Sequence, residues 1–314
     1  MLLAGGLGGA RLAPALARVL GPGRLTVVAN VGDDLEWMGL RVCPDLDSIA
    51  YALAGLWNRR RGWGRRGETF RVRAGLAALD NATWFGVGDR DLALHLERTR
   101  LLQSGRTLTE ATRALVDRLG VRGVDVVPAS DAPAGTRFRL RDGRLLSFQE
   151  WYVREHARAP VIETLLARAP ASSAALRALA AAAVVVLAPS NPITSIGAIL
   201  ALRGMKPAVR TVPRCLAVSP VVLRRPSSSR AIAHHARARR HVLEAAGGSD
   251  CPDAIARRYA GLVEAFVLDH RDGSDANDVR RAGLEPVLAD LLDERSLART
   301  IVEIASRRAS PTRI

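Results

Sequence analysis

The chain has 314 residues, of which 48% are hydrophobic and 25% charged, a composition typical of a globular protein. The longest apolar run, at residues 178–188, is too short to span a membrane, and no basic segment or cleavage site precedes the first glycines; we therefore expect a cytoplasmic protein with no membrane contact. The formal net charge of +15 would suit a nucleic-acid partner, but the arginines are scattered and not interleaved with aromatics, so we expect no nucleic acid.

Cysteine and histidine positions indicate neither a disulfide framework nor a metal centre. The three cysteines are widely spaced and include no CxxC pair, which argues against disulfides and structural zinc. His234, His235 and His241 lie close together in the sequence, but their segment has the pattern of a basic helix. We therefore expect no metal at these histidines.

Short apolar runs alternate along the chain with longer amphipathic stretches rich in alanine and leucine. Most runs are continuously apolar, as expected for parallel strands covered on both faces. We expect strands at residues 1–4, 25–29, 124–127, 184–187, 215–218, 265–268 and 286–289. We expect helices at residues 11–20, 108–119, 174–183, 253–262 and 294–304. Repeated strand–helix units predict a doubly wound, mostly parallel, Rossmann-like α/β sheet with right-handed crossovers.

One segment departs from this rhythm. Residues 136–148 read TRFRLRDGRLLSF, and the central Asp-Gly pair is typical of a β-hairpin turn. We expect this hairpin to belong to an inserted hairpin and helical region at residues 130–172 that caps the substrate. Because no repeat or low-complexity linker divides the chain, residues 1–314 are expected to form a single α/β domain.

The motif GGLGGAR follows the first expected strand and opens the first expected helix. Gly5, Gly6, Gly8 and Gly9 would let backbone N–H groups approach a phosphate, which the helix dipole also favours. The motif is neither a dinucleotide fingerprint nor a P-loop, because Arg11 stands where a third glycine is required and no G-K-[ST] follows. The alternative is a tight strand-to-helix turn that binds no ligand.

Carboxylates follow the second expected strand. Asp33 and Asp34 come directly after it, at the edge where ligands of open α/β sheets bind. The motif CPDLD adds Asp45 and Asp47, two residues apart. If this segment is extended, both of its carboxylates share a face and could hold one Mg²⁺. Alternatively, Asp47 caps a helix that begins at Ser48.

The motif WFGVGDRD occupies residues 84–91. Asp91, His95 and Arg98 recur at helical spacing, so we expect them on one face of a helix that begins near Asp91. Trp84 and the phenylalanine after it are conspicuous in a chain with 4% aromatic residues. They either stack on a flat heterocycle or fill the core, and the pattern alone does not separate these alternatives.

A polar turn follows the expected strand at residues 184–187. Ser190, Asn191 and Pro192, in the motif APSNPITSIG, lead from this strand to the start of a helix. A strand that ends in small polar residues before a helix is typical of a phosphate or nucleotide site. A capped loop without a ligand is the alternative.

Taken together, these motifs resemble one family. GGLGGAR, NVGDD, CPDLD, GWG, WFGVGDRD, PASD, FQEWYVR, APSNPITSIG and AVSP occur in the order and spacing of the 2-phospho-L-lactate transferases of coenzyme F420 biosynthesis, which include phosphoenolpyruvate transferases. The resemblance runs from the first glycines to about Pro220 and resumes at residues 256–269.

The resemblance implies a substituted-phosphate transferase. Its members transfer a phosphorylated three-carbon acid, 2-phospho-L-lactate or phosphoenolpyruvate, from a guanosine diphosphate-linked donor. The acceptor is a ribityl hydroxyl of the deazaflavin Fo, 7,8-didemethyl-8-hydroxy-5-deazariboflavin. GMP leaves, and the product is coenzyme F420-0 or its dehydro form. The resemblance also implies Mg²⁺ as the cofactor and a homodimer as the assembly.

The resemblance also assigns roles to residues of this chain. It implies that Asp45 and Asp47 are catalytic and hold Mg²⁺. The residues it implies for Fo binding are Asp47, Trp84, Gly86, Asp89 and Asp91. The residues it implies for the donor nucleotide are Gly5, Gly6, Gly8, Gly9, Arg90, Ser190, Asn191 and Pro192.

The segment at residues 221–252 departs from the family pattern, which has a glycine-rich stretch and a turn there. Either residues 227–230 replace that turn or the donor site is altered. The main rival function is that of a related group of nucleotide-sugar-binding regulators, whose sequences lack the PDLD and GDRD motifs present here. A nicotinamide-dependent dehydrogenase is disfavoured by the missing third glycine.

Overall fold

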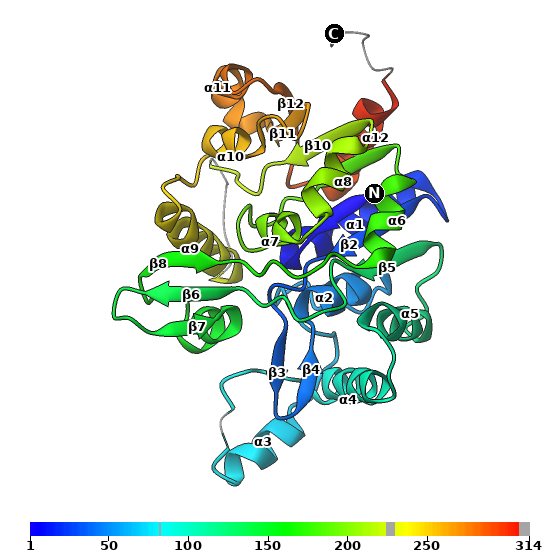
Figure 1. The fold of residues 1–314 in the computed structure, drawn as a ribbon, viewed down its shortest axis with the longest axis vertical. Coiled ribbons are helices and arrows are strands. Elements are labelled where there is room, and N and C mark those ends of the chain that lie inside the picture. Colours follow the sequence, from blue (N-terminus) through cyan, green and yellow to red (C-terminus); the bar gives the residue numbers. More distant parts are fainter. Residues whose placement is uncertain (82, 224–229, 308–314) are drawn as a thin grey trace.

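The computed structural model describes residues 1–81, 83–223 and 230–307. Seven parallel strands form one sheet in the order β12-β11-β10-β9-β1-β2-β5 (Figure 1). Their bounds are β1 Leu2–Ala4, β2 Leu25–Ala29, β5 Val124–Pro128, β9 Val184–Leu187, β10 Arg214–Val218, β11 Ala265–Asp269 and β12 Glu285–Ala289. Each lies where an apolar run predicts a strand, so the doubly wound α/β fold is confirmed.

Helices connect and cover these strands. Their bounds are α1 Gly6–Leu20, α2 Pro44–Leu53, α3 Arg71–Ala78, α4 Asp89–Gln103, α5 Leu108–Arg118, α6 Ser173–Ala180, α7 Ile196–Ala201, α8 Met205–Thr211, α9 Arg230–Ala245, α10 Pro252–Tyr259, α11 Ala276–Arg281 and α12 Glu294–Ser306. The expected basic helix is therefore α9. Of the segment expected to replace the family's turn, residues 227–229 lie outside the described part of the chain.

The strand order reverses direction at β1. From β1 the chain proceeds through α1 to β2 on one side, whereas β9, the other neighbour of β1, leads through α7 and α8 to β10 on the opposite side. Because such crossovers are right-handed, the two series of helices cover opposite faces of the sheet. Helix α1 packs against α2 and α12, and α8 packs against α6 and α7. Loops after β1 and β9 consequently diverge and leave room between them.

Two antiparallel additions extend beyond the main sheet (Figure 1). One is the hairpin of β3 (Leu35–Trp37) and β4 (Leu40–Val42), which the sequence pattern did not predict. The other contains the predicted hairpin, as β6 (Arg137–Leu140) and β7 (Leu145–Ser147), with β8 (Val161–Leu165) on the free side of β6. A π-helical turn, η1 (Glu150–Arg154), lies between β7 and β8, and a 3₁₀ segment, η2 (His270–Asp275), follows β11.

The predicted helix face at residues 91–98 is confirmed. Helix α4 buries the side chains of Asp91, His95 and Arg98 on its inner face. Charged side chains are rarely buried without partners, so a helix that turns three of them inward must meet complementary groups there. Those groups lie in the candidate site.

Candidate active site

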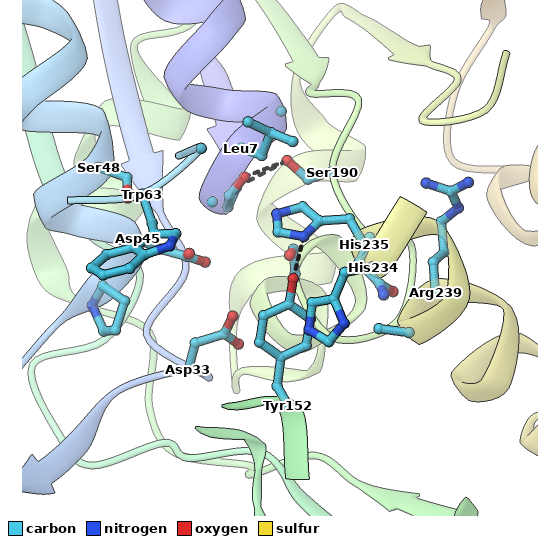
Figure 2. Close-up of a pocket in the computed structure, with 18 of the residues that line it drawn as sticks. Leu7, Asp33, Asp45, Ser48, Trp63, Tyr152, Ser190, His234, His235 and Arg239 are labelled. Atoms are coloured by element: carbon cyan, nitrogen blue, oxygen red, sulfur yellow. Dashed lines mark hydrogen bonds between the residues drawn. The ribbon is translucent and has the colours of Figure 1, made fainter. Parts of the chain in front are cut away.

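A cavity of about 760 Å³ opens at the carboxyl edge of the sheet, between the loops that follow β1 and β9. Open α/β sheets bind their ligands at this kind of switch point. The cavity walls come from the first turns of α1 and α2, the loop after β9, the turn η1 and helix α9 (Figure 2). Motifs that are far apart in the sequence therefore meet around one cavity.

The glycine loop presents backbone to this cavity. A Cβ on Gly8 would stand 2.2 Å from the carbonyl oxygen of Pro189, so a residue with a side chain at this position could not pack against the loop after β9. Ser190 joins the same two loops, because its hydroxyl donates to the Gly5 carbonyl at 2.7 Å and accepts from the Gly5 amide at 3.1 Å. The N-terminus of α1 thus faces the cavity with its positive dipole end, which favours a phosphate.

Two carboxylates that line the cavity accept hydrogen bonds from one buried side-chain amide. Nδ2 of Asn30 donates to Asp33 at 3.1 Å and to Asp45 at 2.9 Å. Burial, followed by repulsion from Asp45, raises the pKa of Asp33 well above its ordinary value. Burial raises the pKa of Asp45 to about 6. Two buried carboxyl groups this close together, both with raised pKa values, favour a shared proton or cation.

The prediction that Asp45 and Asp47 lie in an extended segment and share a face is wrong. Helix α2 begins at Pro44, so both residues lie in its first turn, where a separation of two positions corresponds to about 200° around the axis. Asp45 points to the central amide, whereas Asp47 points to Arg98. The alternative, with Asp47 capping a helix that begins at Ser48, is also wrong because the helix begins four residues earlier.

Asp47 belongs to a buried network on the inner face of α4. The Arg98 guanidinium donates to both carboxylate oxygens of Asp47, at 3.1 Å from Nη1 and at closer range from Nη2. Nδ1 of His95 lies 3.6 Å from Asp47, and its Nε2 lies 3.8 Å from Asp91. The Tyr51 hydroxyl donates to Asp91 at 2.7 Å. A continuous chain of polar groups therefore connects Asp47 with His95, Asp91 and Tyr51 along the cavity wall.

Burial shifts the titration of this network. Burial, with a contribution from the Asp47 charge, raises the pKa of Asp91 to about 7. Burial lowers the pKa of His95 to about 4, so the imidazole is neutral at neutral pH. Asp91 can therefore take up or release a proton near neutral pH, as groups at active sites often do.

Two sets of side chains that line the cavity could hold a metal ion. Asp47, Asp91 and His95 bring their ligand atoms within 4.8 Å of one another. However, Arg98 already neutralises one of these carboxylates, and imidazole suits zinc better than magnesium. Asp33 and Asp45 offer two carboxylates that repel one another and that form no ion pair with any described residue. This all-oxygen pair fits Mg²⁺, which retains several waters and binds substrate phosphates.

Aromatic side chains form one end of the cavity. Trp63, Trp84 and Phe85 line it together with Gly86, where a Cβ would stand 3.2 Å from the Trp63 ring. Phe85 packs against Trp37 of the β3 strand, with ring centroids 6.4 Å apart, and so serves partly as core. The Trp63 side chain is 45% exposed. Its ring is therefore available to stack on a flat ligand.

Helix α9 and the turn η1 form the opposite wall. The Tyr152 hydroxyl is in hydrogen-bond contact with Nδ1 of His235, and the Tyr152 ring stacks on Phe148 with centroids 5.2 Å apart. His234 covers the other side of the tyrosine, with centroids 4.4 Å apart. His234 and His235, two of the three histidines expected in a basic helix, thus line the cavity. Among the described residues, no cluster of metal ligands includes them.

Most of the residues expected to bind ligands line this cavity. They are Gly5, Gly6, Gly8, Asp45, Asp47, Trp84, Gly86, Asp91, Ser190 and Asn191. Gly9, Asp89, Arg90 and Pro192 do not line it.

Asp89 and Gly9 have evident structural roles instead. The Asp89 carboxylate accepts from the backbone amides of Arg71 and Val72, both at 3.1 Å, and from the Thr69 hydroxyl, and so caps the start of α3. A Cβ on Gly9 would stand 2.7 Å from the Cβ of Ala4, so this glycine allows α1 to pack on β1.

Several polar and aromatic cavity residues were not among the expected ligand-binding residues, and four of them matter for the site: Asp33, Trp63, Tyr152 and His235. Three of them lie in motifs noted in the sequence, NVGDD, GWG and FQEWYVR, and the position of Asp33 after β2 was itself a signal. His235 carries no such signal, because it lies in the segment that departs from the family pattern.

Comparison with known proteins agrees with this geometry. The family model described as 2-phospho-L-lactate transferase CofD matches residues 1–307. A phosphoenolpyruvate transferase of Mycobacterium sp. (strain KMS) is 34% identical over 97% of this chain and 98% of its own length. One from Streptomyces avermitilis is 37% identical over 99% of both chains. A solved UPF0052 family member from Bacillus halodurans superposes with a TM-score of 0.61 at 15% identity, covering 96% of this chain and 97% of that one, which shows the fold alone.

The sheet, its switch-point cavity and the polar loops around it define a Rossmann-like α/β protein with a candidate ligand site at the switch point. Within that class, the chain belongs to the CofD family of 2-phospho-L-lactate transferases. In the described part of the chain, no helix has both the length and the apolar character needed to cross a bilayer.

Proposed function

We propose that this chain transfers a phosphorylated three-carbon acid, phosphoenolpyruvate or 2-phospho-L-lactate, from a guanosine diphosphate-linked donor to the ribityl hydroxyl of Fo. The family and the names of the relatives support the transferase class and its place in F420 biosynthesis. The observation that carries the proposal is one continuous cavity with a glycine loop, a carboxylate pair and an aromatic end. These features suit a phosphorylated donor, a cation and a flat acceptor respectively.

The donor diphosphate binds at the glycine loop in this proposal. Gly5, Gly6 and Gly8 offer backbone at the N-terminus of α1, and Ser190 holds the neighbouring loop in place. Phosphates bind well at such a helix terminus because N–H groups and the dipole both favour negative charge. The diphosphate then lies beside Asp33 and Asp45.

The acceptor occupies the aromatic end. The deazaflavin ring stacks on Trp63 or Trp84, and the ribityl chain extends toward the centre of the cavity. Its terminal hydroxyl then lies near Asp47, whose carboxylate Arg98 holds in one orientation. Positioning of this kind supplies much of the rate in phosphoryl transfer, because the reacting groups need alignment more than covalent help.

The expected cofactor is Mg²⁺, and the carboxylates of Asp33 and Asp45 would hold it. When bound, the ion would neutralise charge on the donor phosphates. The hydroxyl oxygen of Fo forms a bond to the phosphorus that bears the acid, and the bond from this phosphorus to the bridging oxygen breaks. The bridging oxygen leaves with GMP, and the hydroxyl proton passes to Asp47. Asp45 therefore serves the cation and Asp47 the acceptor, a division of roles that follows from their opposite directions on α2.

Titration of purified protein with Fo, followed by deazaflavin fluorescence with and without GDP and Mg²⁺, tests the acceptor. We expect micromolar binding that weakens in Asp47→Ala and is unchanged in Asp117→Ala, an exposed aspartate on α5 outside the cavity. Turnover with guanylylated phosphoenolpyruvate and phospholactate then identifies the donor. Folded protein that binds no Fo under any condition would overturn the proposal and favour a nucleotide-binding regulator.

A further inference from the structure

Two segments that are far apart in the sequence meet over the cavity through several side-chain contacts. Tyr152 comes from η1, between β7 and β8, and His235 comes from α9, 83 residues later. Phe148 and His234 enclose the Tyr152 ring from two sides, and Arg237 of α9 donates to the carbonyl of His156 at 3.1 Å. The hydroxyl and the imidazole are therefore held in fixed positions before any ligand binds, which lowers the entropic cost of binding.

The pair has one hydrogen available for a ligand in either tautomer. If the Tyr152 hydroxyl donates to Nδ1 of His235, then Nε2 carries a hydrogen that the contact does not use. If Nδ1 instead donates to the hydroxyl oxygen, the hydroxyl hydrogen is free. Burial lowers the pKa of His235 to about 4, so the pair is neutral at neutral pH. It can accommodate an anion by hydrogen bonding without contributing a charge of its own.

The position of the pair relates it to the carboxylates. Figure 2 shows Asp33 and Asp45 between Trp63 on one side and Tyr152 with His235 on the other. The pKa of Tyr152 is raised, mainly by burial, and the charges of Asp33 and Asp45 contribute, as expected for neighbouring groups. The Tyr–His pair therefore lies across these carboxylates from Trp63.

Two arginines that line the cavity already have partners. Arg239 of α9 forms two hydrogen bonds with Asp250, at 2.6 and 3.1 Å, and Arg11 of α1 is paired with Glu294 at 2.8 Å. An anionic group beside the central carboxylates therefore finds both guanidinium groups already paired, whereas Tyr152 and His235 offer neutral hydrogen-bond donors.

The donor in the proposed reaction has one anionic group besides its phosphates. Its acid carries a carboxylate a few bonds from the transferred phosphorus, so this carboxylate must lie close to the carboxylate pair that holds the cation. The aromatic end is filled by the acceptor. We propose that Tyr152 and His235 form the subsite that binds the carboxylate of the three-carbon acid. This inference rests on the proposed function, and it assigns donor specificity to a residue in the divergent segment of this chain.

The test compares two ligands that differ by the acid. Dissociation constants for guanylylated phosphoenolpyruvate and for GDP are measured by calorimetry without Fo, in wild type, Tyr152→Phe and His235→Asn. A hydrogen bond to a charged group contributes enough for a tenfold effect. We expect the preference for the acid-bearing ligand over GDP to fall at least tenfold in both variants, with GDP affinity within about twofold of wild type.

The matched control is Tyr259→Phe. This buried tyrosine lies outside the cavity, and its hydroxyl has no hydrogen-bond partner among the described residues, so the variant loses the same atom without touching the site. Wild-type preference in Tyr152→Phe and His235→Asn would overturn the inference. If His235→Asn fails to fold, Tyr152→Phe decides the question. This substitution removes only the hydroxyl oxygen, so we expect the variant to fold like wild type. Wild-type protein that prefers the acid-bearing ligand but never modifies Fo would instead overturn the proposed acceptor and leave the subsite supported.

Discussion

Arg98 and Asp47 form an ion pair that is almost entirely shielded from water, with side chains 2% and 7% exposed. The pair connects α4 to the first turn of α2 and fixes the direction of the Asp47 carboxylate. Burying two charges costs several kcal/mol of desolvation, so such a pair adds little net stability compared with apolar side chains of similar size. The main effect of the ion pair is therefore the orientation that it imposes on Asp47.

Replacing Arg98 by methionine should destabilise the protein strongly. The substitution leaves Asp47 as an unpaired buried charge, and the expected loss in the free energy of unfolding is about 3–5 kcal/mol. Denaturant unfolding measures it. The double variant Arg98→Met/Asp47→Leu should recover much of that loss, and Arg118→Met, which removes an exposed pair with Glu97, should cost less than about 1 kcal/mol. Equal losses in the two single arginine variants would contradict the argument.

The raised pKa values of Asp33 and Asp45 predict a pH-dependent response to Mg²⁺. A carboxyl group with a raised pKa in the folded state binds more protons there than in the unfolded chain, so stability falls as pH rises from about 4 through the raised pKa, which is about 6 for Asp45. A cation that binds the ionised pair opposes this loss. We therefore expect Mg²⁺ to raise Tm more at pH 8 than at pH 5.

The variant Asp33→Asn checks the origin of this effect. It removes the repulsion between the two carboxylates, so the metal-free protein should be more stable than wild type at pH 8. The increase in Tm on adding Mg²⁺ should shrink. Differential scanning fluorimetry across pH, with Ca²⁺ as a second cation, provides the measurement. An Mg²⁺ response that is independent of pH and unaffected by Asp33→Asn would place the cation elsewhere.

The main sheet was predictable because its strands are apolar runs, most of which are covered on both faces. For β11, every residue from Ala265 to Asp269 is buried, so nothing in its sequence competes with the strand pattern. The first turn of α2 was mispredicted for a local reason. Proline restricts the residue before it, and Cys43 is indeed non-helical, but proline itself is favourable at the first position of a helix.

The central contacts of the site depended on packing that no local pattern specifies. Asp33 and Asp45 share the Asn30 amide only because α2 lies beside the end of β2. The contact of Tyr152 with His235 joins two separate insertions, and neither periodicity nor spacing relates them. Motif order identified the family, whereas the partners of each side chain required the three-dimensional arrangement.

Gly8 should be intolerant of even one added methyl group. In Gly8→Ala the new Cβ would stand 2.2 Å from the Pro189 carbonyl oxygen, a backbone atom that cannot turn aside. We expect a loss of about 1–3 kcal/mol in the free energy of unfolding and weaker binding of GDP, because α1 must move away from the loop after β9. The control is Gly75→Ala in α3, where a Cβ meets no atom within 4 Å; it should stabilise the protein by up to about 1 kcal/mol.

Trp63 provides a test of the aromatic end that is separable from folding. Its side chain is 45% exposed, so Trp63→Ala should leave Tm nearly unchanged. Stacking of a flat heterocycle on an aromatic side chain contributes about 1–3 kcal/mol, so Fo affinity measured by fluorescence should fall about tenfold or more. Trp63→Phe should retain most of the affinity. Leu96→Ala, which removes a comparably exposed apolar side chain outside the cavity, should bind Fo like wild type. If Trp63→Ala also binds Fo normally, the deazaflavin stacks on Trp84 or lies elsewhere.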